Sequence, residues 1–304
     1  MALLAGCATP QVAQLAQSTG GLSQTAELTA VPFYPQEDYQ CGPASLAEVI
    51  AFNGIEASPE ALVKEVYVPA RQGSLQAEML AAARRHGLVA YALAPRLADV
   101  LREVEAGTPV IVLANLAFDF APVWHYAVVV GYDLPREDLV LRSGVTRRLS
   151  MTLSNFERIW ARGGYWSMVA MPPGRVPSSA DPDAYVSAIA ALERIEPRSA
   201  RIAYQAALAR WPDHLVAQLG LGNAAYALGD LSSAEQAYRA AAERHPDSGD
   251  AWNNLAQAAL EQGRRGEAIE AARRAVALGG PRLAQYRATL EDIERRAGGK
   301  DAGR

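Results

Sequence analysis

The chain has 304 residues, of which half are hydrophobic and a fifth are charged. This length allows about two domains, each with a sizeable core, and the composition is typical of a globular protein. The formal net charge of −4 gives no sign of nucleic-acid binding, which relies on clustered Lys and Arg. No apolar stretch reaches the roughly 20 residues that a membrane-spanning helix needs. The chain is therefore expected to be soluble, or to be anchored by something other than a helix.

Residues 1–29 predict a leader remnant followed by a flexible tether. The run 4–7 reads Leu-Ala-Gly-Cys and resembles the lipobox of bacterial lipoproteins, in which the Cys, here Cys7, becomes the lipidated first residue. The positive and apolar stretches that normally precede it are missing, because Met1 lies only six positions upstream. This suggests a start codon assigned too late or a clipped chain. The rest of the segment is rich in Ala, Gln, Ser and Thr, as in a tether behind a lipid anchor; the alternative is an ordinary Cys in a frayed terminus.

Residues 30–171 predict an α+β domain in which helices come first and an antiparallel sheet follows. Apolar spacing and Gly or Pro boundaries predict helices at 43–53, from Ser58-Pro59 onward, at 74–86 and at 97–106. Short β-branched or aromatic runs predict strands at 109–113, 125–132, 138–141 and 165–170.

The Pro- and Ser-rich segment 172–180 predicts a linker, and the Ala-rich chain 181–297 predicts an all-α repeat array. The same residue types recur there at a fixed spacing of 34 residues: Pro212 and Pro246, Gly229 and Gly263, Ala234 and Ala268, Ala241 and Ala275. This is the period of the tetratricopeptide (TPR) repeat, which the array resembles, and small residues would let its helices approach closely. We expect about three units, the first degenerate, then a capping helix over 282–296 and a disordered tail over 298–304.

Cys41 has the setting of a catalytic nucleophile. It lies directly before a predicted helix, where the positive end of the helix dipole and a nearby imidazolium lower the pKa of a thiol. Gly42 permits a tight turn, and Pro43 suits the first helical turn, where its missing N–H costs nothing. A Gln shortly before the nucleophile can donate to the oxyanion of an acyl-transfer intermediate. Gln36 and Gln40 are both available, and the spacing favours Gln36 because Gln40 is adjacent to the Cys.

The candidate general base is His125, one of only four His residues in the chain. His214 and His245 lie next to the repeat-boundary prolines, and His86 ends a predicted helix, where a cation simply favours the dipole. In contrast, His125 begins the strongest predicted strand, over 124–132, which would hold its side chain rigidly.

Together these residues resemble the peptidases that process bacteriocin leaders at a double glycine, a branch of the papain-like fold. The resemblance covers roughly residues 30–171. It rests on Gln-x4-Cys-Gly-Pro-Ala-Ser-Leu-Ala from Gln36 and on His-Tyr-Ala-Val-Val-Val-Gly-Tyr from His125. It implies Cys41 as the nucleophile, His125 as general base and acid, and Gln36 as the oxyanion-hole donor.

One position departs from the family pattern. The family orients its His with an Asp, usually in Asp-Pro at the end of the next strand, and here that place falls on Ser143-Gly144. A Ser hydroxyl can accept from an imidazole N–H but cannot stabilise an imidazolium as a carboxylate does. Ser143 is our nominal third residue; Asp133 and Asp138 lie nearby, although Asp residues in turns more often cap loops.

These features predict a cysteine peptidase, a thiol hydrolase of peptide or amide bonds, that needs no cofactor or metal. We expect it in the bacterial cell envelope, facing the periplasm and held to the membrane only by a lipid anchor. Its partners would be a peptide or protein substrate and a protein bound in the TPR groove. The chain has no transporter spans and no Gly-x4-Gly-Lys-Ser/Thr loop, so bacteriocin export is not implied.

Two alternatives to an active peptidase stay open. One is an inactive peptidase fold that serves as a binding or scaffold protein in an envelope assembly. The missing Asp favours this alternative, and the intact Cys, His and Gln oppose it. The other is a cell-wall amidase of the same fold, which differs only in its substrate.

Overall fold

The computed structural model describes residues 9–36 and 40–298. Cys7 and residues 299–304 of the predicted tail lie outside this part of the chain. The chain divides into two compact units, Met1–Ala188 and Ile189–Arg304, and the division falls within one helix. No helix in the described residues is long and apolar enough to cross a bilayer.

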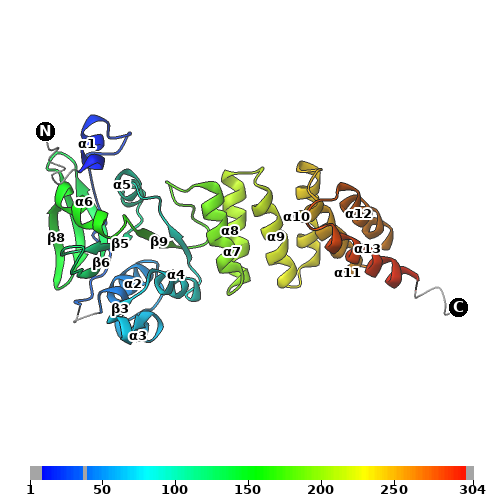
Figure 1. The fold of residues 1–304 in the computed structure, drawn as a ribbon, viewed down its shortest axis with the longest axis horizontal. Helices are drawn as coiled ribbons and strands as arrows, with labels where there is room; N and C mark the ends of the chain where they lie inside the picture. The colour runs from blue at the N-terminus through cyan, green and yellow to red at the C-terminus, as the bar shows by residue number, and fades with distance from the viewer. Residues whose placement is uncertain (1–8, 37–39, 299–304) are drawn as a thin grey trace. The chain divides into compact units, whose positions relative to one another are not determined.

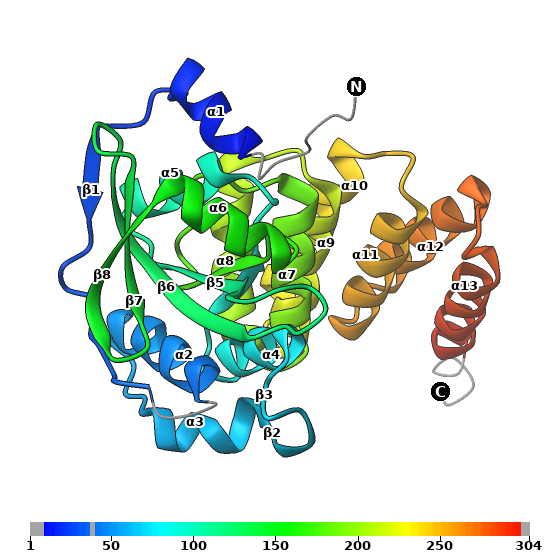
Figure 2. The ribbon, with the colours of Figure 1, turned by 60° about the vertical axis from the view of Figure 1, so that its left-hand side comes forward.

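The first unit is built on a seven-stranded antiparallel sheet (Figure 2). Its strands follow the order β4-β9-β5-β6-β7-β8, and β1 pairs with the end of β6. A Cβ at Gly131 would lie 2.8 Å from the carbonyl oxygen of Ala26. The glycine at this position therefore lets β1 come close enough to pair with β6. The strands are β1 (Thr25–Glu27), β4 (Val89–Ala92), β5 (Val110–Asn115), β6 (Trp124–Asp133), β7 (Asp138–Ser143), β8 (Thr146–Thr152) and β9 (Ser167–Met171), with β2 (Tyr67–Val68) and β3 (Gly73–Ser74) forming a separate ladder.

Helices cover both faces of this sheet (Figures 1 and 2). The core on one face joins α2 to alternate residues of β6, namely Tyr126, Val128 and Val130, while the residues between them point to the other face. The helices of the first unit are α1 (Pro10–Gln17), α2 (Cys41–Phe52), α3 (Pro59–Val66), α4 (Gln76–Arg85), α5 (Leu97–Glu105) and α6 (Leu153–Arg162), with a 3-10 turn η1 (Pro69–Arg71). An α+β unit followed by a helical array is therefore confirmed.

The elements expected from apolar spacing are present close to their predicted bounds. The predicted helices correspond to α2, α3, α4 and α5, and the predicted strands correspond to β5, β6, β7 and β9. Ser58 caps α3 as expected, because its hydroxyl accepts the N–H of Ala61 at 3.3 Å.

The structure differs from the expectation of a flexible tether before residue 30. Residues 10–17 form α1, and the buried carboxylate of Glu157 on α6 accepts the N–H groups of Gln11 (3.0 Å) and Val12 (2.8 Å). These are helix-terminal donors that otherwise lack a partner, and a carboxylate at this end also favours the helix dipole. Val12 and Leu15, three residues apart on one helix face, are buried. The polar composition concealed this short amphipathic face.

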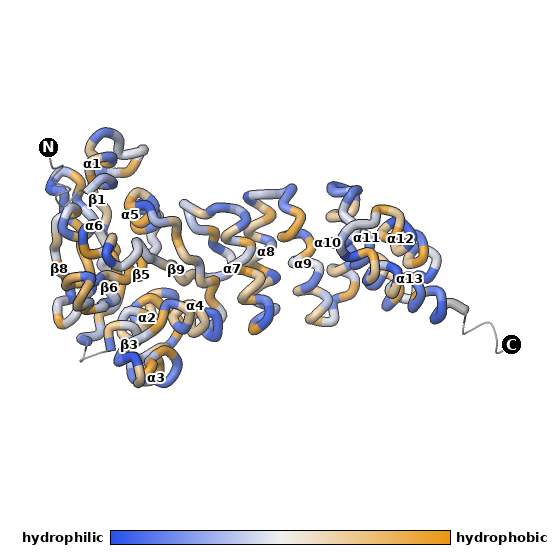
Figure 3. Tube along the Cα trace, viewed as in Figure 1, coloured by the Kyte–Doolittle hydropathy of each residue, from blue (hydrophilic) through white to orange (hydrophobic). Residues whose placement is uncertain are grey.

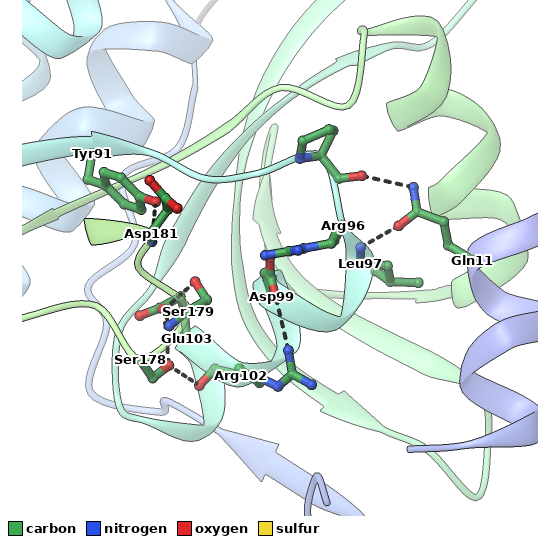
Figure 4. Close-up of polar contacts among 11 residues, drawn as sticks. Gln11, Tyr91, Arg96, Leu97, Asp99, Arg102, Glu103, Ser178, Ser179 and Asp181 are labelled. Atoms are coloured by element: carbon green, nitrogen blue, oxygen red, sulfur yellow. Dashed lines mark hydrogen bonds and ion pairs between the residues drawn. The ribbon is translucent and has the colours of Figure 1, made fainter. Parts of the chain in front are cut away.

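The segment predicted as a linker is fastened to α5 by hydrogen bonds (Figure 4). Glu103, which is fully buried, accepts from the hydroxyl of Ser178 (3.0 Å) and from the N–H and hydroxyl of Ser179 (2.8 and 2.7 Å). Next to them, the N–H of Asp181 donates to the Tyr91 hydroxyl at 3.1 Å. Buried polar groups need such partners, so the end of this segment is part of the first unit.

The second unit is a stack of helices, along which hydrophilic and hydrophobic residues alternate (Figure 3). A Cβ at Gly220 would lie 2.2 Å from the ring of Tyr204, and one at Gly222 would lie 2.3 Å from the ring of Tyr238. The expectation that small residues let the helices approach is therefore confirmed. The division cuts α7 (Pro182–Glu193), and the helices after it are α8 (Pro197–Arg210), α9 (Leu215–Ala227), α10 (Leu231–Arg244), α11 (Gly249–Glu261), α12 (Arg265–Leu278) and α13 (Leu283–Gly298).

Glu48 on α2 gives the first unit a pH-dependent stability. The residue is 0 % exposed, and its Oε1 accepts the N–H of Tyr34 at 3.1 Å. Burial raises the pKa of this carboxyl from its ordinary 4.5 to about 8, against smaller opposite effects of Tyr34 and Arg142. The folded state thus holds a proton that the unfolded chain releases near pH 4.5. The stabilising contribution is complete below pH 4.5 and is lost as the pH rises toward 8.

Glu48→Gln keeps the acceptor for Tyr34 and removes the titrating group. We expect the free energy of unfolding of the wild type to fall between pH 5 and pH 8 by roughly 2–4 kcal/mol more than that of the variant. Urea unfolding at several pH values measures how steeply the free energy of unfolding changes with pH in the wild type and in the variant. Equal slopes would contradict a protonated Glu48 in the core.

Candidate active site

Cys41 is the first residue of α2, so the packing of α2 on the sheet fixes its place. Leu46, Val49 and Ile50 of this helix are fully buried in the core shared with β6. The thiol is free and half-buried. The backbone N–H of Tyr126 acts on the thiol and lowers its pKa. Helix packing therefore brings the Cys to the residue that follows His125.

The expected lowering of the thiol pKa is wrong for this resting structure. Burial raises the pKa of Cys41, and it outweighs the N–H groups of Tyr126, Gly42 and Cys41 itself, which act in the opposite direction. Burial also lowers the pKa of His125 below its ordinary 6.5, so its imidazole is neutral near pH 7. Both groups are therefore uncharged at rest, and the structure holds no preformed thiolate–imidazolium pair between these two residues.

His125 is held in place by Ser143. The imidazole Nε2 lies 2.8 Å from the Ser143 hydroxyl, which ends β7 beside β6. Because Ser143 occupies Nε2, the other ring nitrogen, Nδ1, remains for proton exchange. The hydroxyl fixes the orientation of the ring but adds no negative charge, so nothing in this pair opposes the effect of burial on the imidazole.

Gln36 is oriented by Gly144, the residue after Ser143. The Gln36 N–H donates to the Gly144 carbonyl (3.0 Å), and the Gly144 N–H donates to Gln36 Oε1 (3.1 Å). Since a backbone N–H can only donate, Oε1 must face Gly144 and Nε2 must face away from it. Nε2 is buried and has no hydrogen-bond partner among the described residues. A buried donor without an acceptor costs about 1–3 kcal/mol, so Nε2 is available to an incoming hydrogen-bond acceptor.

The turn between β7 and β8 thus positions two candidate residues together. Ser143 contacts His125, and Gly144, at a φ of +57°, contacts Gln36. Gly144 had no role in the sequence prediction. A glycine following a strand indicates a tight turn, but its pairing with a residue more than a hundred positions earlier has no local signal.

The other sequence candidates lie elsewhere. Asp133 and Asp138 face each other across the hairpin at the far end of β6 and β7. They accept from the Arg136 N–H (3.1 Å) and the Ser150 hydroxyl (3.0 Å). Eight residues of strand, about 26 Å, separate Asp133 from His125, so this Asp is a turn residue as its position suggested. The described residues contain no cluster of three or more His, Cys, Asp and Glu that could hold a metal ion.

Gly42 is required by close packing against Ser74, a contact that the sequence did not reveal. A Cβ at Gly42 would lie 2.3 Å from the Ser74 hydroxyl oxygen and 2.6 Å from its Cβ. Contacts under 3.0 Å force something to shift, so a side chain at this position would displace Ser74 or the start of α2, which carries Cys41. The absence of a side chain at Gly42 therefore sets the position of the thiol.

We expect Gly42→Ala to destabilise the first unit by about 1–3 kcal/mol and to change the alkylation rate of Cys41. Adding Ser74→Gly removes the clashing side chain and should restore both quantities. Urea unfolding and iodoacetamide labelling of the two single variants and the double variant form a complete cycle. A double variant no better than Gly42→Ala would show that the contact is not the cause.

Comparisons with known proteins agree with the two-unit description. Residues 28–168, which contain all four described site residues, match the model of the Peptidase_C39 like family. Residues 185–248 and 219–282 each match the model of the tetratricopeptide repeat. A crystal structure described as a C39-like peptidase from Bacillus anthracis is 18% identical, covers 49% of this chain and 98% of its own, and has a TM-score of 0.41. No curated protein matches the chain.

Proposed function

Because residues 28–168 form a domain of the Peptidase_C39 like family and tetratricopeptide repeats follow it, we propose that the protein is a cysteine peptidase whose repeats bind a protein partner. The observation that carries this proposal is the turn shared by two site residues. Ser143 orients His125, and Gly144 directs the free amide of Gln36. Cys41 begins the helix beside them.

In the proposed reaction, His125 removes the thiol proton of Cys41 as the sulfur attacks the carbonyl carbon of a peptide bond. A C–S bond forms, and the carbonyl oxygen takes the electron pair. Gln36 Nε2 and the backbone N–H of Cys41 donate to that oxygen. The imidazolium then gives its proton to the leaving amine as the C–N bond breaks. Water, deprotonated by His125, attacks the thioester and releases the acid and the thiol.

Cleavage of a synthetic peptide library, followed by mass spectrometry, tests the proposal directly. Cys41→Ala removes the nucleophile and is expected to abolish every cleavage that the wild type makes. His86→Ala is the control, because the half-buried His86 pairs with Glu65 (3.2 Å) and not with a candidate site residue. Cleavage that persists unchanged in Cys41→Ala would contradict a cysteine peptidase.

The uncharged resting pair predicts a particular pH profile for alkylation of Cys41 by iodoacetamide. As the pH increases, the labelling rate of the wild type should rise in two steps. The first occurs below the ordinary imidazole pKa of about 6.5, as His125 loses its proton, and the second occurs above about pH 8.5, as the thiol ionises. His125→Ala should remove the lower step and slow labelling at pH 7 by at least about tenfold. Peptide mapping separates Cys41 from Cys7. An unchanged lower step in the variant would contradict the role of His125.

One observation favours the rival function, an inactive peptidase fold that acts as a binding module. Ser143 supplies a hydroxyl where the family places a carboxylate, so an imidazolium would lack a charged partner. Ser143→Asp discriminates between the two functions, because a carboxylate beside Nε2 raises the pKa of His125. If the wild type cleaves the library, the variant should shift its acid limb to higher pH. If only Ser143→Asp cleaves, the natural protein is a binding module.

We further propose that the protein is lipid-anchored in the bacterial envelope through Cys7. The support is the lipobox-like run 4–7, which the structure does not describe. Metabolic labelling with an alkyne fatty acid, in a bacterium that expresses the full gene, should mark the wild type and leave Cys7→Ala unmarked. Equal labelling of the two proteins, or none in either, would contradict the anchor.

A further inference from the structure

Exposed apolar side chains in the described part of the first unit concentrate around the candidate active site. Leu75 follows Ser74, which packs against Gly42, and Val145 follows Gly144, the partner of Gln36. Every other large hydrophobic residue exposed in this described part lies in the loop between β5 and β6 or, for Trp124, at the start of β6 next to His125. These are Leu116, Phe118, Phe120, Val123 and Trp124.

The loop between β5 and β6 is closed and held rigidly. Asn115, 1 % exposed, accepts with one amide oxygen from the N–H groups of Ala117 (3.1 Å) and Val123 (3.0 Å). The Leu116 N–H also donates to the Val123 carbonyl at 2.9 Å. Arg162 on α6 in turn donates to the Asn115 carbonyl at 3.2 Å. The loop therefore presents its side chains in one preorganised arrangement, which lowers the entropy lost on binding.

Two phenyl rings dominate the exposed surface of this loop. Phe118 is 65 % exposed and Phe120 is 86 % exposed. Their rings stack with centroids 5.4 Å apart and planes 6° apart, so they form one continuous apolar surface. Exposure of this kind costs solubility unless a partner covers it, and such patches mark binding sites.

The chemistry of the loop favours a polypeptide over a lipid surface. Segments that bind membranes combine apolar residues with Lys or Arg for the anionic headgroups. The run from Leu116 to Trp124 contains no Lys or Arg, and Asp119 lies between the two phenylalanines. In addition, the apolar residues come from three separate segments, each next in sequence to a residue that contacts the candidate site or belongs to it. A substrate chain entering that site would contact all three.

We propose that these side chains, which we call the apolar rim, select polypeptide substrates that carry large apolar side chains beside the scissile bond. Phe118 and Phe120 are the main specificity determinants. This inference rests on the proposed peptidase function, and its test is arranged so that either can fail alone.

The test uses tripeptidyl chloromethyl ketones in which Phe replaces Ser at one position at a time. The sulfur of Cys41 displaces chloride from such a probe and forms a stable thioether, which mass spectrometry detects. At least one Phe probe should label wild-type Cys41 about tenfold or more faster than the all-Ser probe. Phe118→Ser with Phe120→Ser should bring this ratio to within about threefold of unity. Both residues are exposed, so the fold should be kept.

Two controls isolate the effect of the rim. Iodoacetamide carries no side chain and should label the wild type and the double variant at equal rates, which shows an intact site. Ile202→Ser with Val216→Ser removes two exposed apolar residues from the repeats (48 and 54 % exposed) and should keep the wild-type ratio.

The remaining outcomes separate the alternatives. Equal labelling by all ketones would overturn the rim while leaving the peptidase function intact. If no ketone reacts, the peptidase function fails, and the rim is judged by whether acetylated Phe peptide amides protect Cys41 from iodoacetamide. Absence of protection would overturn it. A last outcome would assign the loop to a lipid surface instead. In that case the wild type floats with phosphatidylethanolamine–phosphatidylglycerol vesicles, the variant with both Phe118→Ser and Phe120→Ser does not, and no Phe probe labels Cys41 faster than the all-Ser probe.

Discussion

A pair of hydrogen bonds between Gln36 and Gly144 is the contact on which the candidate active site depends. It joins the chain that leads into α2 to the turn between β7 and β8. The segment before the helix that begins at Cys41 is thereby tied to the hairpin whose strand β7 pairs with the His125-bearing strand β6. The same contact settles which end of the Gln36 amide faces away from Gly144. Ser143, one residue earlier, fixes the imidazole. A shift of this turn would therefore disturb the candidate oxyanion donor Gln36 and the candidate base His125 together.

Burial both positions the site and constrains its chemistry. Cys41 and His125 are each largely removed from water, and each group then favours its uncharged form. Glu48, on the same helix, responds in the same direction. A protein that needed a stable thiolate at rest would have to offset this effect with a carboxylate on the imidazole, and Ser143 does not supply one.

The sequence predicted the elements with strong periodicity and the residues with distinctive chemistry. α2 and β6 show apolar spacing that only a core-facing helix and a buried strand produce. In contrast, β8 is a mostly exposed strand at the sheet edge, with a polar sequence that resembles a loop. α1 and the segment after β9 are held by Glu157 and Glu103, through contacts with distant residues that no local pattern records. The sign of the Cys41 pKa shift also depended on burial, which a motif does not report.

The two glycines of α9 have a consequence for the repeats as a mechanical array. The rings of Tyr204 and Tyr238 occupy the spaces beside Gly220 and Gly222, so this helix is flanked by an aromatic ring on each side. Each Gly weakens a helix by about 1 kcal/mol relative to Ala, and α9 thus keeps its shape largely through its neighbours. If α9 opens, the rings of Tyr204 on α8 and Tyr238 on α10 lose the surfaces against which they pack.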